Sequence, residues 1–181
     1  MWVDVRPFPS RFIDSTWDRV NVGDNYVYRA GEIYTFANQA LTSKPLSVSA
    51  DEAFRIVFDQ AYLFTGTFNG QPVTKGIAYV EISDDGGASW QQAGTFQGES
   101  AGFPSMVATE LDLGMAYASQ QVQVRFRLET DTVTRLVIDP TVPGGFGFPA
   151  VPVNEAWMID NMTFEGITNQ PFTTIVEQDA E

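Results

Sequence analysis

The sequence has no cysteine and no histidine among its 181 residues. The lack of cysteine excludes disulfides and thiolate chemistry, and zinc and copper lose their preferred sulfur and imidazole ligands. The Ser-His-Asp and Cys-His mechanisms are excluded because histidine, their general base, is absent. Carboxylates are therefore the groups left for acid–base catalysis or for binding a hard cation.

Basic residues are few. Lysine and arginine number 10 against 23 aspartates and glutamates, which gives a net charge of −13 at pH 7. A surface with this balance repels a phosphate backbone, so we expect no nucleic-acid partner. An acidic surface favours solubility and is compatible with bound calcium.

Long apolar runs are also missing. None approaches the ~18 residues that a membrane-spanning helix needs, so we expect no membrane insertion. The residues that follow Met1 lack the basic and apolar regions of a secretory signal peptide. The length suits one domain over residues 1–181, either a cytosolic protein or, as we favour, a segment of a longer chain.

The sequence does contain a repeated alternation of apolar and polar residues, which is typical of half-buried strands. It is clear in residues 54–59, 77–83 and 122–129. In 77–83 Tyr79, Glu81 and Ser83 would lie on the face away from the core, and in 122–129 Arg125 and Arg127 would face outward. Residues 157–164 are apolar on both faces, which predicts a central strand covered on each side. Glycine-rich turns separate these stretches. The pattern predicts an all-β, jelly-roll-like antiparallel sandwich.

Residues 83–90 read Ser-Asp-Asp-Gly-Gly-Ala-Ser-Trp, the spacing of an Asp-box. The carboxylate of Asp85 would accept backbone N–H bonds across the turn, the glycines would allow positive φ, and Trp90 would pack over the hairpin. Sialidases carry several such boxes, whereas a single copy predicts a hairpin and no activity.

The order of motifs along the chain resembles a known family. Tyr79 to Ser83 precede the Asp-box, Leu111-Asp112-Leu113 and the strand 122–128 follow it, and Trp157-Met158-Ile159-Asp160-Asn161 closes the pattern. This order is similar to that of the MAM-like jelly-roll accessory domains of secreted bacterial hydrolases, notably fungalysin-type metallopeptidases. The resemblance covers about residues 43–165. Residues 1–42 would form N-terminal strands outside it, and 166–181 a C-terminal strand or tail. The family's last motif has two aspartates, whereas Asn161 follows Asp160 here.

The resemblance implies a non-catalytic accessory module of a larger secreted or cell-surface bacterial protein. Its partner would be a polysaccharide or a neighbouring domain of the parent protein. Calcium is the cofactor that it suggests. Asp160 is the first candidate ligand because it matches the family motif, and Asp131 and Asp139 are further candidates at the long 139–153 loop. A hard cation needs six to eight oxygens, and Asp160 has the alternative role of accepting backbone N–H bonds at a strand crossing.

Two aromatic groups are candidate contacts. Residues 25–36 read as a hairpin with a turn near Ala30-Gly31, which would place Tyr26, Tyr28 and Tyr34 on one face. Exposed, they would stack on sugar rings; buried, they would belong to the core. Phe146 and Phe148 would form a docking tip in the long loop or fold back onto the sandwich.

Two other functions stay open. One is a purely structural or assembly domain that braces a neighbouring catalytic domain. The other is a glycosidase with two carboxyl groups about 5–10 Å apart, for which no motif selects a pair. We expect that the chain is not an enzyme.

Overall fold

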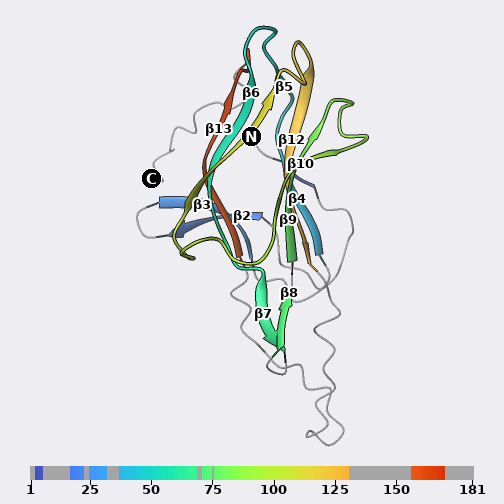
Figure 1. The fold of residues 1–181 in the computed structure, drawn as a ribbon. Coiled ribbons are helices and arrows are strands. Elements are labelled where there is room, and N and C mark those ends of the chain that lie inside the picture. Colours follow the sequence, from blue (N-terminus) through green and yellow to red (C-terminus); the bar gives the residue numbers. More distant parts are fainter. Residues whose placement is uncertain are drawn as a thin grey trace, which may run out of the picture.

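The computed structural model describes residues 3–5, 17–22, 25–31, 37–68, 71–74, 76–130 and 156–169. Within them the chain forms two packed antiparallel sheets, seen as two layers in Figure 1. The first sheet has the order β1 (Val3–Val5), β4 (Ala37–Thr42), β12 (Gln121–Thr130), β9 (Gly76–Ser83) and β10 (Gln91–Phe96), and β5 (Leu46–Ser47) also pairs with β12. The second has the order β11 (Val107–Gly114), β6 (Phe54–Tyr62), β13 (Ala156–Glu165), β3 (Asn25–Gly31) and β2 (Trp17–Val22). The predicted jelly-roll-like β-sandwich is confirmed.

The core lies between the sheets and follows the predicted alternation. The apolar residues of the three alternating stretches are buried, namely Phe54, Ile56, Phe58, Ala78, Val80, Ile82, Val122, Val124, Phe126 and Leu128. Trp157 is fully buried at its centre; it lies 5.8 Å from Phe126 between ring centroids and donates its indole N–H to Gln60 Oε1 at 2.9 Å. The prediction for 157–164 holds for the position of β13, which is the middle strand of its sheet, and for its first residues, where Met158 is buried on the opposite face. Coverage on both faces does not extend past the bulge after Asp160, because Asn161 and Thr163 are exposed.

The hairpin expected near Ala30-Gly31 is wrong. β3 runs through Gly31 and pairs with β2 on one side and β13 on the other. Ala30 lies opposite both Trp17 and Trp157, whose ring centroids are 5.4 Å apart. The small side chain of Ala30 leaves room for the two indole rings to contact each other. The alanine is therefore explained by packing inside a strand and not by a turn.

Four of the described strands, β1 to β4, lie before position 43. β1 and β4 belong to the first sheet and β2 and β3 to the second, so both layers include N-terminal strands. At the other end of the chain, Thr168 donates its N–H to Ser47 O at 2.8 Å, and Asn169 Oδ1 accepts the Ser47 N–H at 2.7 Å.

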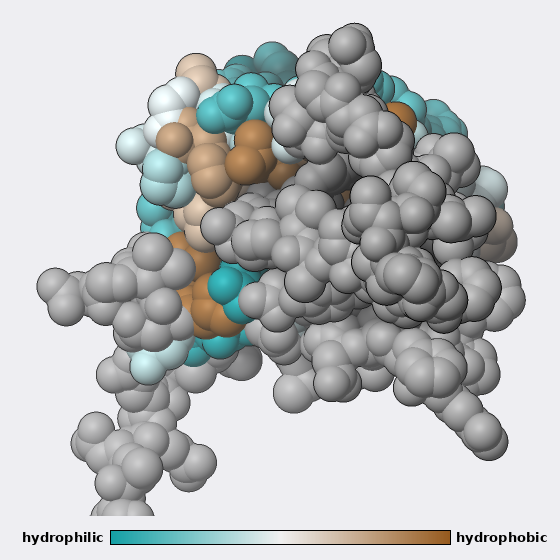
Figure 2. Space-filling model, turned by 90° about the horizontal axis from the view of Figure 1, so that it is seen from below, coloured by the Kyte–Doolittle hydropathy of each residue, from teal (hydrophilic) through white to brown (hydrophobic). Residues whose placement is uncertain are grey.

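A separate two-stranded ribbon, β7 (Thr65–Phe68) and β8 (Gln71–Thr74), extends from one end of the sandwich (Figure 1). Figure 2 shows the molecule from that end, where hydrophobic residues of the described chain reach the surface beside hydrophilic ones. In the part of the chain that the structure describes, no helix is long and apolar enough to cross a membrane.

Candidate functional site

The outer face of the first sheet carries a cluster of charged and aromatic side chains. Arg125 and Arg127 point outward from β12, and the strand register places Glu81 of β9 opposite Arg125 and Tyr79 opposite Arg127. The exposed fraction of Glu81 is only 7%. The sequence predicted that Glu81 would point out of the core, which it does, but the two arginines cover it.

The carboxylate of Glu81 binds both arginines. Its Oε2 accepts from Arg125 Nε at 2.6 Å and from Arg127 Nε at 2.9 Å, and its Oε1 accepts from an Arg127 Nη at 3.1 Å. Arg127 also donates to Glu129 Oε2 at 2.8 Å. One carboxylate therefore fixes two neighbouring guanidinium groups.

Each arginine also stacks on an aromatic ring. The guanidinium carbon of Arg125 lies 4.1 Å from the ring centroid of Trp90, and that of Arg127 lies 4.2 Å from the ring centroid of Tyr79. Both distances are within the range of cation–π attraction. The four side chains and Glu81 form what we call the arginine platform: Tyr79, Glu81, Trp90, Arg125 and Arg127.

The electrostatics of the platform keep Glu81 ionised. Burial by itself raises the pKa of Glu81, but hydrogen bonds and charge attraction from Arg127 and Arg125 outweigh it, so the pKa lies below its ordinary value. A general acid needs a raised pKa at neutral pH. Glu81 is therefore suited to hold the arginines and unsuited to donate a proton.

The turn between β9 and β10 forms one wall beside the platform. Ser89 donates to Asp85 through its backbone N–H at 2.9 Å and through its hydroxyl at 2.6 Å, and the Ser83 hydroxyl donates to Asp85 at 2.7 Å. Hydrogen bonds from Ser89 and then from Ser83 lower the pKa of Asp85 far below its ordinary value. Trp90 Nε1 donates to Gly87 O at 3.1 Å, and Gly87 has φ +95°. The local contacts predicted for this turn are all present.

Between this wall and β4 lies an open groove of about 370 Å³. The short side chains Ala40 and Thr42 of β4 leave its floor low, whereas the turn at Gly86 and Gly87 raises one side. Its lining combines amide, hydroxyl and guanidinium groups with an indole ring: Asn38, Ala40, Thr42, Gly86, Gly87, Trp90, Gln123, Arg125 and Arg127. Among the described residues no carboxylate lines it, although the chain as a whole is strongly acidic.

The tyrosines predicted as a sugar-binding row lie elsewhere, on β3 of the second sheet. Tyr28 is partly buried and packs against the main core. Tyr26 is 47% exposed, and the guanidinium carbon of Arg19 lies 4.8 Å from its ring centroid. Tyr34 lies outside the described residues. The described part of the row thus consists of one exposed ring and one ring that contributes to the core.

Asp160 lies on β13 opposite Asp59 of β6, beside a bulge at which the register shifts. Asn161 has φ +49°, a conformation that asparagine tolerates better than most residues, and its amide donates to Asp59 Oδ2 at 2.8 Å. The described residues contain no group of three or more acidic side chains that would hold a metal ion. Asp131 and Asp139, like Phe146 and Phe148, lie outside the described residues, so the predicted calcium site stays a prediction.

Comparison with solved structures gives distant similarities, one of which is described here. No known protein family matches the sequence of this chain, and no curated protein sequence is similar to it. A solved structure described as that of a family 35 carbohydrate binding module from an environmental isolate superposes with a TM-score of 0.44 and 13% sequence identity. The superposition covers 96% of this chain and 100% of that chain. Binding of carbohydrate is stated for that protein.

The arginine platform was missed by sequence reasoning, although each strand was assigned correctly. Arg125, Arg127 and Glu81 were all expected to face outward. The alternation of a strand does not reveal which strand lies beside it, so the pairing of Glu81 with the two arginines was not visible. The sequence did offer one signal for an ion pair between strands: Arg125 and Arg127 stand at successive outward positions of one strand, and Glu81 stands at an outward position of another.

Proposed function

We propose that the chain is a non-catalytic binding module whose groove beside the arginine platform binds a polysaccharide. The observation that carries the proposal is the mixed lining of the groove. Trp90 offers an apolar ring, while Gln123, Thr42 and Asn38 offer hydrogen-bonding groups along the same floor. A sugar presents apolar C–H faces and hydroxyl groups within one ring, and this lining has partners for both.

Rigidity supports a binding role. Arg125 and Arg127 are held by Glu81 and by two aromatic rings, so little side-chain entropy is lost when a ligand contacts them. Within the described chain, the contacts of Arg125 use its Nε and the face of its guanidinium group, which leaves its Nη donors for a ligand oxygen. A fixed set of donors in a groove selects ligands by geometry.

A peptide ligand fits the groove less well. β12 pairs with β4 on one side and with β9 on the other, so its backbone donors and acceptors are already used. An extended peptide binds a sheet by adding a strand at a free edge, which the groove does not have. Recognition there must use side chains, as it does for sugars.

The test is affinity electrophoresis followed by calorimetry with soluble xylan, galactomannan, carboxymethyl-cellulose and polygalacturonate. We expect retention by at least one polysaccharide. Gln123→Ala should weaken binding about tenfold, since one lost hydrogen bond costs ~1 kcal/mol or slightly more. Trp90→Ala should weaken it at least as much because the apolar contact is lost.

Gln91→Ala is the matched control. Gln91 is an exposed glutamine of β10, on the same sheet, and it does not line the groove. Its substitution should leave affinity unchanged, and the melting temperatures of all variants establish that they fold. Loss of binding in Gln91→Ala together with the others, or no binding by the wild type, would contradict the proposal and favour a domain that braces its neighbour.

The remaining expectations belong to the same proposal. A secreted or cell-surface location fits a polysaccharide ligand, and a fusion to a reporter expressed with the full parent protein would test it. Calcium at Asp160 with Asp131 and Asp139 stays a prediction, because Asp131 and Asp139 lie outside the described residues.

A further inference from the structure

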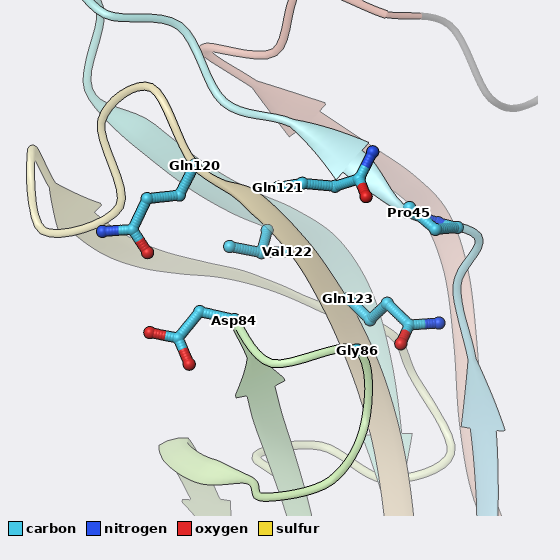
Figure 3. A pocket seen from close by; sticks show the side chains of 7 residues that line it. All are labelled: Pro45, Asp84, Gly86, Gln120, Gln121, Val122 and Gln123. Carbon is cyan, nitrogen blue, oxygen red and sulfur yellow. The ribbon is translucent and has the colours of Figure 1, made fainter.

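A second hollow adjoins the groove at the end of the first sheet. It measures about 320 Å³ and is lined by Pro45, Asp84, Gly86 and residues 120–123 (Figure 3). The picture shows Gln121 and Gln123 extending to the side of Pro45, whereas Gln120 and Asp84 extend to the opposite side. Amide groups therefore dominate this hollow, and they offer both donors and acceptors.

The two hollows adjoin each other, and together they are called the groove below. Gly86 and Gln123 line both of them. Gln121, Gln123, Arg125 and Arg127 occupy alternate positions of β12, so all four project from the same face of the strand. The lining residues of β12 run from Gln121 to Arg127, and at ~3.3 Å per residue these six steps span about 20 Å.

The lining changes along this length. The arginine platform lies at one end, the glycine turn narrows the middle, and the glutamines with Pro45 lie at the other end. A single sugar would contact only one of these regions. A groove whose successive outward side chains all carry hydrogen-bonding groups suits a ligand with a repeating set of hydroxyl groups.

We infer that the groove binds a linear polysaccharide lying along β12, with the part of the second hollow between Pro45 and Gln121 as a second subsite. This inference rests on the proposed function and deepens it by naming the class of ligand: an extended chain and not a monosaccharide or a chain end. Gln121 is the residue that distinguishes the two subsites, because it is exposed, lines only the second hollow and lies one strand repeat from Gln123.

The experiment is calorimetric titration of the whole chain with xylo-, manno-, cello- and galacturono-oligosaccharides of one to six units. We expect affinity for the bound series to rise at least tenfold between one and four units and then to level off as the groove fills. Gln121→Ala should weaken binding of the longest oligosaccharides threefold to tenfold and leave the shortest one that binds unchanged. Gln123→Ala should weaken both.

The outcomes separate the two proposals. Affinity that does not depend on chain length, or a Gln121→Ala variant that binds every length as the wild type does, overturns the second subsite while Gln123→Ala still supports the proposed function. Absence of binding by every series overturns both. Gln91→Ala is again the control, and equal melting temperatures exclude unfolding as the cause of any loss.

Discussion

Glu81 provides the sharpest test of how the arginine platform is held. In Glu81→Gln the side chain keeps its shape but loses its charge and one of its two acceptor oxygens. Arg125 and Arg127 would then face each other as neighbouring cations. Their side chains are 22% and 15% exposed, so water solvates them only partly.

The structure sets the expected size of the effect. Removing one partner of a buried ion pair costs about 3–5 kcal/mol, and the partial exposure of the arginines places this case at the lower end, about 3 kcal/mol. For a chain of this length that corresponds to a fall in melting temperature of about 6–12 °C. Glu129→Gln is the matched control: Glu129 also binds Arg127, but its side chain is 43% exposed, so its loss should cost less than ~1 kcal/mol.

Urea unfolding followed by tryptophan fluorescence at pH 7 measures both variants, with equal m-values showing that only stability has changed. If Glu81→Gln and Glu129→Gln lowered the free energy of unfolding by the same small amount, the arginines would be solvated without Glu81. The view that Glu81 organises the groove would then be refuted.

Three further predictions concern the rest of the sandwich. Gly166→Ala should destabilise the domain by about 3 kcal/mol, because Gly166 has φ +70° and an added Cβ would meet the backbone carbonyl of Ala53. Gly98→Ala is the control and should cost about 1 kcal/mol, because Gly98 has a similar φ of +78° but no atom near its Cβ position. A loss of stability in thermal melts that is no larger for Gly166→Ala than for Gly98→Ala would contradict this packing. The pKa of Asp85 is lowered in the folded state, so the ionised carboxylate stabilises the fold fully above the unfolded pKa of ~3.9 and less as the pH falls below it. The difference in melting temperature between the wild type and Asp85→Asn should therefore shrink below about pH 4. A difference that stays constant with pH would argue against the turn contacts. If calcium binds at Asp160, millimolar calcium should raise the melting temperature by about 5–11 °C relative to EDTA and to magnesium. The rise should be absent in Asp160→Ala. A wild-type melting temperature that calcium does not change would contradict the calcium site.

The strands of both sheets show why local patterns predicted some features and not others. The sequence identified β6, β9, β12 and β13, because the spacing of apolar residues along a strand indicates whether one or both of its faces are buried. It misplaced the turn at Ala30, because a small residue beside a glycine has two explanations: a chain reversal, or room for large neighbours. Only the packing of Trp17 against Trp157 distinguishes them.

In the candidate site, too, local sequence predicted some features and tertiary packing determined the others. The sequence by itself determined the class of the fold, the inward residues of the main strands and the hydrogen bonds of the 83–90 turn, since these depend on residues within about ten positions of one another. Tertiary structure alone decided that Glu81 lies beside Arg125 and Arg127, more than forty residues away, and that Trp90 closes over one of them. Strand order and register bring these residues together, and both are set by how two whole sheets bury their inner faces, a property of the complete chain that no single strand contains.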